Sequence, residues 1–200
     1  IWVVDTACIV PMQLVGKAHD RAYVYRDSTR KLYKQRLGRN WIEQPDPVTK
    51  YQPKDLPFQP IDLERDDIRS LISLCEIDHS VGPIPHTLGG SEQGYHRWDS
   101  FKKNGLRYYA KTRNDALRDG VSRMSAYLHY GMVSPFRIAR EAMQYGGEGA
   151  EKYLDELLIW RELAYAFCFY RPNHESLQAT PKWSIETLAK HEDDARPALY

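Results

Sequence analysis

The stretch EKYLDELLIWRELAYAFCFY, residues 151–170, carries the clearest information on the fold. Its apolar side chains fall on nearly every side of a 3.6-residue period, which predicts a long helix from about Glu151 to Tyr170. The residues that make this helix apolar include Tyr153, Leu157, Leu163, Ala164 and Phe167.

Glu156 and Trp160 are four residues apart in this helix, so a carboxylate and an indole lie on one face. Burying a bare carboxylate costs several kcal/mol, so Glu156 must be paired, hydrogen-bonded or at the edge of a cavity. Two interpretations remain open. Glu156 pairs with a neighbouring Lys or Arg, which the residues alone favour, or it faces a pocket.

The rest of the chain from residue 60 onward predicts helices and connectors without a strand. Helices are predicted for residues 20–38, for DDIRSLISLCEI (66–77), from Ser91 through Tyr109, after Ser134 as N-cap with Pro135 at the first helical position, and in SIETLAKHEDDA (184–195). Connectors are predicted for the proline-rich residues 40–60, for the loop 81–90 and for GGEG at 146–149.

Residues 1–10, IWVVDTACIV, are predicted to form a single buried strand that Pro11 closes. A lone strand is not stable, so its sheet must lie elsewhere. Because the sequence starts at Ile1 inside this run and stops at ARPALY without a polar tail, we expect a piece of a longer protein.

The stretch GVSRMSAYLHYGMVSP, residues 120–135, places two serines and an arginine directly after a glycine. Backbone N–H groups at a helix start favour an anion, and serine hydroxyls add donors, so Ser122 and Ser125 suit a diphosphate. An ordinary helix cap is the more frequent use of such a pattern. Upstream, Tyr109 and Arg113 are four residues apart and could reach the same ligand or a nearby nucleic-acid phosphate.

Composition excludes several classes of protein. The 28 basic residues nearly balance the 27 acidic ones, so the net charge of +1 does not by itself predict any kind of binding partner. The cysteines are Cys8, Cys75 and Cys168, without a CxxC, which favours reduced thiols in a cytosolic protein.

The histidines show no metal-ligand spacing, and we expect no metal. No run approaches the ~18 apolar residues of a membrane span, and we expect a cytoplasmic protein, nuclear in a eukaryote.

A basic stripe lies in the predicted helix 20–38, where Arg26, Arg30 and Lys34 are spaced by four. A solvated helix face is the favoured interpretation, and a track along a DNA backbone is the alternative.

Together these stretches resemble the photolyase/cryptochrome family, most closely the class II cyclobutane-pyrimidine-dimer photolyases. Four segments carry the resemblance: VDTACIVP (4–11), YAKTRNDALRDGVSRMSAYLHYG (109–131), LDELLIWRELAYAFCFYRPN (154–173) and WSIETLAKHEDDARPALY (183–200). The resemblance implies a helical FAD-binding domain, preceded by the last strand of an otherwise missing α/β (Rossmann-like) domain. The implied limits are 1–19 for the end of the α/β domain, 20–60 for a basic helix and connector, and 61–200 for the helical domain without its C-terminal part.

The resemblance also implies roles for individual residues. The FAD phosphates and ribityl chain would be held by Tyr109, Val121, Ser122, Arg123, Met124 and Ser125. Double-stranded DNA carrying a pyrimidine dimer would be the partner of a monomeric protein. Arg113 would contact the DNA backbone, Glu156 would hydrogen-bond the flipped dimer, and Trp160 would pack against its bases. Arg161 and Glu162 would complete the pocket wall. Reduced FAD, excited by light, supplies the electron that splits the dimer in this family.

The sequence departs from the family pattern at a few positions. Val121 stands where the family usually has Thr, and Ala126 replaces a common Pro. Tyr165 and Ala166 stand where class II members generally have Asp-Asn. The leading hypothesis is light-driven repair, with these 200 residues inactive alone. The alternatives are a cryptochrome-like flavin photoreceptor, which Arg113, Glu156 and Trp160 argue against, and a degenerate helical module without flavin.

Overall fold

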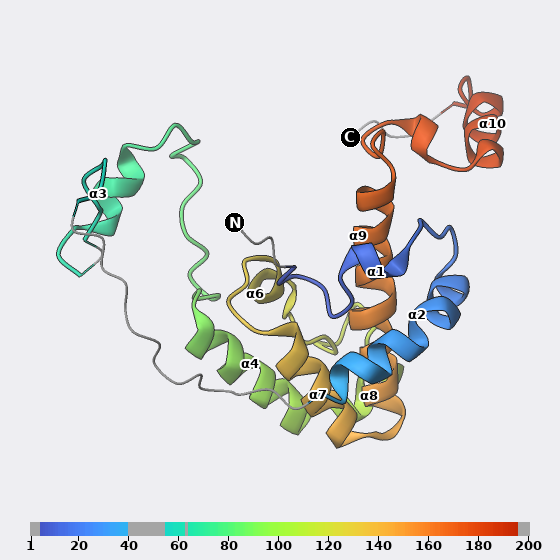
Figure 1. The fold of residues 1–200 in the computed structure, drawn as a ribbon, viewed down its shortest axis with the longest axis horizontal. Helices are drawn as coiled ribbons and strands as arrows, with labels where there is room; N and C mark the ends of the chain where they lie inside the picture. Colours follow the sequence, from blue (N-terminus) through green and yellow to red (C-terminus); the bar gives the residue numbers. More distant parts are fainter. Residues whose placement is uncertain (1–4, 40–54, 63, 196–200) are drawn as a thin grey trace. The chain divides into compact units, whose positions relative to one another are not determined.

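The structure is a computed structural model that describes residues 5–39, 55–62 and 64–195. These residues form helices joined by turns and loops, and none of them lies in a strand (Figure 1). The prediction of a mainly α-helical protein is therefore confirmed. The elements are α1 (Met12–Val15), α2 (Ala22–Leu37), α3 (Ile68–Ser73), α4 (Ser91–Asn104), η1 (Leu106–Tyr108), α5 (Tyr109–Thr112), α6 (Ser125–His129), α7 (Pro135–Tyr145), α8 (Gly147–Leu154), η2 (Asp155–Trp160), α9 (Arg161–Tyr170), η3 (Leu177–Ala179) and α10 (Lys182–Lys190).

The chain divides into two compact units, residues 1–39 with 89–200 and residues 40–88. The smaller unit contains α3. Asp67 caps this helix, because its carboxylate accepts hydrogen bonds from the backbone N–H groups of Arg69 and Ser70. This helix is shorter than the predicted 66–77, and its residues are half-buried or exposed, because little packs against its apolar side. Most of the predicted connector 40–60 lies outside the described residues. The domain limits at residues 19 and 60 stay predictions.

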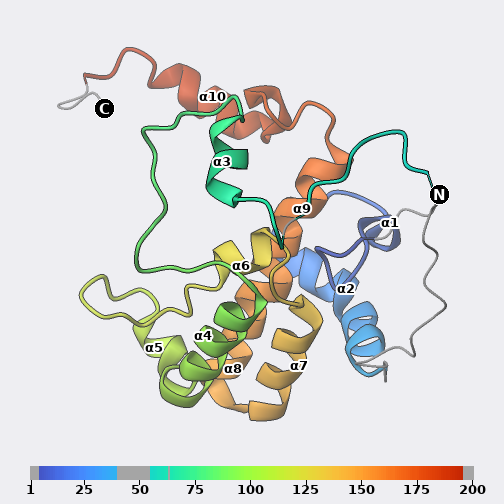
Figure 2. The ribbon, with the colours of Figure 1, turned by 90° about the vertical axis from the view of Figure 1, so that its left-hand side faces the viewer.

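The core of the larger unit is one continuous helix formed by α8, η2 and α9, from Gly147 to Tyr170. It confirms the long helix predicted from about Glu151 and begins four residues earlier. Its middle turn, η2, is a π-helix, an arrangement that is rare and frequent at functional sites. Tyr153, Leu157 and Ile159 are buried, and α7, α5 and η1 pack around α8 (Figure 2).

The helix predicted from Ser91 to Tyr109 ends early, at Asn104. Gly105 follows, and the chain tightens into η1 before α5 begins at Tyr109. A side chain at Gly105 would lie 2.8 Å from the Phe101 ring, so this tight corner favours glycine. Trp98, fully buried in α4, packs against Tyr153 with ring centroids 5.3 Å apart and joins α4 to the long helix.

The glycines of GGEG do not all break the helical pattern, and this part of the prediction is wrong. Gly146, with φ 68°, separates α7 from α8, but Gly147 already begins α8. Gly149 is buried within α8, and a Cβ there would overlap the Leu106 carbonyl oxygen and lie 2.8 Å from the carbonyl of Arg107. Gly149 is therefore needed for the close approach of α8 to η1.

The predicted strand at residues 1–10 is wrong for its described part, because residues 5–10 form bends and irregular backbone. Residues 1–4 lie outside the described residues. The Ile9 and Val10 N–H groups donate to the two oxygens of the Glu162 carboxylate, at 2.6 and 3.2 Å. The Cys8 N–H donates to Asp5 Oδ1 at 3.0 Å. Side chains thus occupy the backbone donors that a strand ladder would use.

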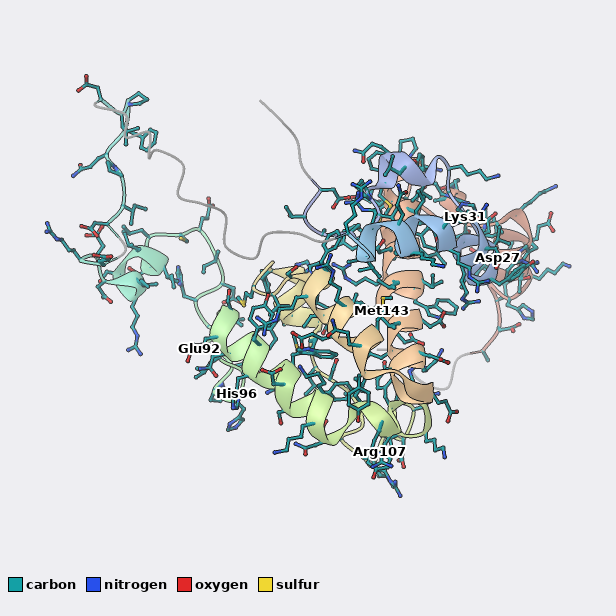
Figure 3. All side chains as sticks on the ribbon, turned by 60° about the horizontal axis from the view of Figure 1, so that its bottom comes forward. Asp27, Lys31, Glu92, His96, Arg107 and Met143 are labelled. Atoms are coloured by element: carbon teal, nitrogen blue, oxygen red, sulfur yellow. The ribbon has the colours of Figure 1, made fainter. Side chains whose placement is uncertain are left out.

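Helix α2 confirms the helix predicted at 20–38 and explains its sequence. One face is buried and carries Tyr25, Thr29, Tyr33 and Leu37, spaced by four. The opposite face is exposed, and Asp27 and Lys31 point outward from it (Figure 3). Of the basic stripe, Arg30 and Lys34 are exposed, whereas Arg26 pairs with Asp155 of η2 at 2.5 Å.

Candidate functional site

A pocket of about 690 Å³ opens between α5, α6 and the long helix. This volume lies within the range of small-molecule sites in proteins. Its walls come from three separate stretches of sequence: the start of α5, the loop and helix at 122–129, and residues 153–165. The lining residues are Tyr109, Ser122, Met124, Ser125, Ala126, Leu128, His129, Tyr153, Glu156, Leu157, Arg161, Ala164 and Tyr165.

Among the predicted site residues, the structure brings six to this pocket and leaves four outside its lining. The six are Tyr109, Ser122, Met124, Ser125, Glu156 and Arg161. The four are Arg113, Val121, Arg123 and Trp160. Arg113 nevertheless contacts a lining residue, Glu156, and Trp160 immediately precedes another, so these two flank the pocket. The roles assigned to all ten stay predictions.

The loop before α6 has an unusual backbone. Arg123 has φ 55°, in the left-handed region that few residues other than glycine adopt. Its guanidinium pairs with Asp119 at 3.0 Å, on the exposed side of the loop. Gly120 is buried, and a Cβ there would lie 2.5 Å from the Thr112 carbonyl oxygen. This turn directs the Ser122 and Ser125 side chains to the pocket.

The helix-cap interpretation of these serines receives little support. The N-cap residue of α6 is Met124, which is buried, and no side chain caps this helix. The Ser122 hydroxyl lies 3.4 Å from the Met124 N–H, at the long limit for a hydrogen bond, and also bonds to the Tyr153 side chain. Burial raises the pKa of Tyr153 above its usual range, so its hydroxyl keeps its proton.

Glu156 satisfies both interpretations that the sequence left open. Its Oε2 lies 3.0 Å from Arg113 Nη2, and its Oε1 lies 2.8 Å from Lys152 Nζ. The same side chain lines the pocket and is 24% exposed. Arg113 also stands over the Tyr109 ring, 5.8 Å from its centroid. Glu156 is therefore a paired carboxylate at the edge of a cavity.

Arg161 places a guanidinium without hydrogen-bond partners in the pocket wall. Its Nη1 and Nη2 atoms are buried and have no hydrogen-bond partner. The guanidinium lies 5.0 Å from the centroid of Tyr165, a cation–π arrangement that leaves its donors unused. Buried donors are nearly always satisfied in proteins, so these atoms fit a ligand that brings acceptors.

Glu162, predicted in the pocket wall, does not line the pocket, and that prediction is wrong. Its carboxylate is fully buried on another side of α9, where it accepts from the Ile9 and Val10 N–H groups and from the Tyr33 hydroxyl at 2.8 Å. Burial raises the pKa of Glu162 to about 7 against these hydrogen bonds.

The departures from the family pattern have different environments. Val121 is 42% exposed and outside the pocket lining. Tyr165 lines the pocket, whereas Ala166 is buried in the core. Ala126, the remaining departure, also lines the pocket, so Tyr165 and Ala126 are the departures that change the pocket surface.

Lys152 is a site residue that sequence reasoning missed. A usable signal was present, since Lys152 and Glu156 are four residues apart in the predicted helix and such pairs meet on one face. Tyr153, which the helical pattern assigns only to packing, also lines the pocket.

Within residues 5–39, 55–62 and 64–195, no group of three or more His, Cys, Asp or Glu side chains could hold a metal ion. In the same part of the chain, no helix has both the length and the apolar character needed to cross a membrane.

No family model matches the sequence. Curated proteins named deoxyribodipyrimidine photo-lyase do. The protein from Potorous tridactylus is 31% identical over 128 residues, which are 62% of this chain and 24% of the relative. The protein from Methanothermobacter thermautotrophicus is 34% identical over 112 residues, 56% of this chain and 25% of the relative. The protein from one strain of Thermus thermophilus is 34% identical over 120 residues, 60% of this chain and 28% of the relative.

These similarities confirm the resemblance to the photolyase family that the sequence motifs indicated. The chain spans about a quarter of the length of these relatives. The activity, substrates and partners of the whole protein are therefore matters for proposal.

Proposed function

We propose that the protein repairs cyclobutane pyrimidine dimers in DNA by light-driven electron transfer from reduced FAD, as a class II photolyase. One observation carries the proposal: the pocket at which Glu156 and Arg161 meet the loop at Ser122–Ser125, from stretches that each resemble the family. The relatives' shared name, deoxyribodipyrimidine photo-lyase, supports the same reaction. Because the chain spans a quarter of these relatives, we propose that 200 residues do not suffice for repair.

The pocket fits a flavin dinucleotide by its donors. Ser122 and Ser125 present hydroxyls, and Arg161 presents two buried N–H-bearing atoms without partners, which suits the diphosphate or other acceptors of FAD. Tyr109 and Met124 supply apolar wall. Reduced FAD, when bound, supplies the electron on absorbing light. The protein's part is to bind, orient and exclude water. Val121 and Arg123, whose side chains lie outside the lining, would contribute through backbone groups.

The edge of the pocket suits a flipped DNA base and the phosphate backbone next to that base. The indole of Trp160 is 51% exposed, which leaves a ring face free for stacking, and base–aromatic stacking is a usual means of holding extruded nucleotides. Glu156 presents carboxylate oxygens that accept hydrogen bonds from a base edge. Arg113 would reach a backbone phosphate by exchanging its ion pair with Glu156.

The decisive experiment is the absorption spectrum of the purified full-length protein, followed by illumination with dimer-containing DNA. A flavin band and light-dependent loss of dimers are expected. A flavin band without dimer loss would favour the photoreceptor, and no flavin band would leave the degenerate helical module. Val121, Tyr165 and Ala166 are the residues that motivate this last alternative.

Glu156→Ala tests the assignment within the site. We expect the repair yield to fall while the FAD content stays near that of the wild type, because Glu156 lies at the pocket edge. Glu151→Ala is the matched control, since Glu151 is an exposed carboxylate of α8 one turn away. Loss of FAD in the Glu156 variant, with the control unaffected, would mean that Glu156 is structural.

A further inference from the structure

Lys152 lies between two consecutive carboxylates at the start of η2. Its Nζ is 2.8 Å from Glu156 Oε1 and 3.3 Å from Asp155 Oδ2. Asp155 has a second cation, because Arg26 of α2 holds its Oδ1 with Nε at 3.0 Å and Nη2 at 2.5 Å. Arg26 thus already pairs with Asp155. The contact of Lys152 with Glu156 is also the shorter of its two contacts, so Glu156 is the main partner of Lys152.

Helix stability alone does not account for this pair. Lysine precedes glutamate by four residues, which is the less favourable order for an ion pair along a helix. The pair is also partly sheltered, with the Lys152 and Glu156 side chains 34% and 24% exposed. The hydrogen bond to Glu156 raises the pKa of Lys152, so the lysine is a full cation at neutral pH.

The two cations on Glu156 hold different oxygens. Arg113 takes Oε2 from the segment after α5, and Lys152 takes Oε1 from within the same helix as Glu156. A nucleic-acid phosphate that draws Arg113 away removes the cation on Oε2 only. The bond from Lys152 to Oε1 is local to one helical turn, so it survives a displacement of Arg113.

We propose that Lys152 is a positioning residue that holds the Glu156 carboxylate oriented at the pocket while Arg113 engages a DNA phosphate. This inference rests on the proposed repair function and extends it to a residue outside the pocket lining. Lys152 acts through Glu156 and does not itself touch the substrate.

Rescue of the repair rate by a second cationic side chain at position 152 separates this role from simple structural support. The other charged or titratable groups that face Glu156 or line the pocket beside it are Arg113 after α5, Tyr109 of α5, His129 of α6, Tyr153 of α8, and Arg161 and Tyr165 of α9. None of them changes in a Lys152 variant. Neutralising Lys152 removes only the cation on Glu156 Oε1, and an arginine at position 152 supplies a cation there again.

The experiment compares full-length wild type with Lys152→Met, Lys152→Arg and the control Lys103→Met, an exposed lysine of α4. Repair rate at saturating dimer DNA, DNA affinity and flavin absorbance are measured for each protein. We expect Lys152→Met to lower the repair rate roughly three- to tenfold with flavin content and DNA affinity unchanged. Lys152→Arg should restore the repair rate, because it returns a cation to the position beside Glu156.

Three outcomes would overturn the inference, and they are distinguishable. A wild type without repair refutes the proposed function and this role with it. A wild type that repairs while Lys152→Met matches it in repair rate refutes the positioning role alone. Joint loss of flavin and repair in Lys152→Met, with Lys103→Met normal, assigns Lys152 to the fold.

Discussion

Gly149→Ala separates helix propensity from packing, because the two predict opposite signs. Gly149 lies inside α8, where alanine is the better helix former by ~1 kcal/mol. Propensity alone therefore predicts that the variant is more stable. The structure predicts the reverse, since the added Cβ would overlap the Leu106 carbonyl oxygen across the α8–η1 contact.

The size of the effect follows from the atoms that the methyl group meets. The carbonyl carbon and oxygen of Arg107 would both lie 2.8 Å from the Cβ, inside the 3.4 Å of ordinary contact. These are backbone atoms of η1, which cannot rotate away as a flexible side chain could. Overpacking costs ~1–3 kcal/mol, and backbone obstruction favours the upper end. After the ~1 kcal/mol gain in propensity, we expect a net loss of about 2 kcal/mol in the free energy of unfolding.

Urea unfolding followed by far-UV circular dichroism measures this difference, and thermal unfolding should show a midpoint ~4–8 °C lower. Glu148→Ala is the control, because Glu148 is the exposed neighbour in α8 and its replacement should change stability by less than ~0.5 kcal/mol. A Gly149→Ala protein as stable as the wild type would refute the close contact between α8 and η1.

Two further predictions concern titration and thiol chemistry. The pKa of Glu162 is raised to about 7 in the folded protein, so the folded state binds the extra proton and the free energy of unfolding should fall as pH rises from about 4.5 to about 7. Burial disfavours ionised Glu141 as well, but Lys102, Arg137 and Trp98 donate to it and lower its pKa to about 2, so stability should also fall as pH drops from about 4.5 towards 2. Urea unfolding across pH should show a maximum near pH 4.5, and a steady rise through pH 7 would contradict the burial of Glu162. In the native protein, Ellman's reagent should modify the exposed thiols of Cys75 and Cys168. It should spare Cys8, because burial raises the pKa of that thiol to about 12. Rapid reaction of all three cysteines would contradict the packing of Cys8.

Helical periodicity predicted the long helix well, because its apolar pattern records burial along its whole length. The apolar run at residues 5–10 and the glycine-rich stretch at Gly149 led to wrong predictions for a shared physical reason. Both depend on a contact with a distant segment: Glu162 binds the N–H groups of Ile9 and Val10, and η1 lies against Gly149. A single sequence contains no local sign of either contact.

The pocket was predicted in part. Glu156 posed a choice between pairing and facing a cavity, and the structure gives both, since pairing with Arg113 and Lys152 is what allows a carboxylate to stand at a mostly apolar pocket edge. The family resemblance indicated Arg161, but the buried guanidinium without hydrogen-bond partners, and its place over the Tyr165 ring, could come only from the three-dimensional structure.

The adjacent residues Arg161 and Glu162 show how the fold sets the site. Successive side chains of a helix point about 100° apart, so the direction of one fixes the direction of the next. Glu162 is held by two backbone N–H groups and by Tyr33, which fixes the rotation of α9 about its own axis. With Glu162 fixed, the Arg161 side chain points into the pocket wall, where its Nη1 and Nη2 atoms have no hydrogen-bond acceptor. The N-terminal segment, far from the pocket in sequence, thereby helps to position the cation that we assign to ligand binding.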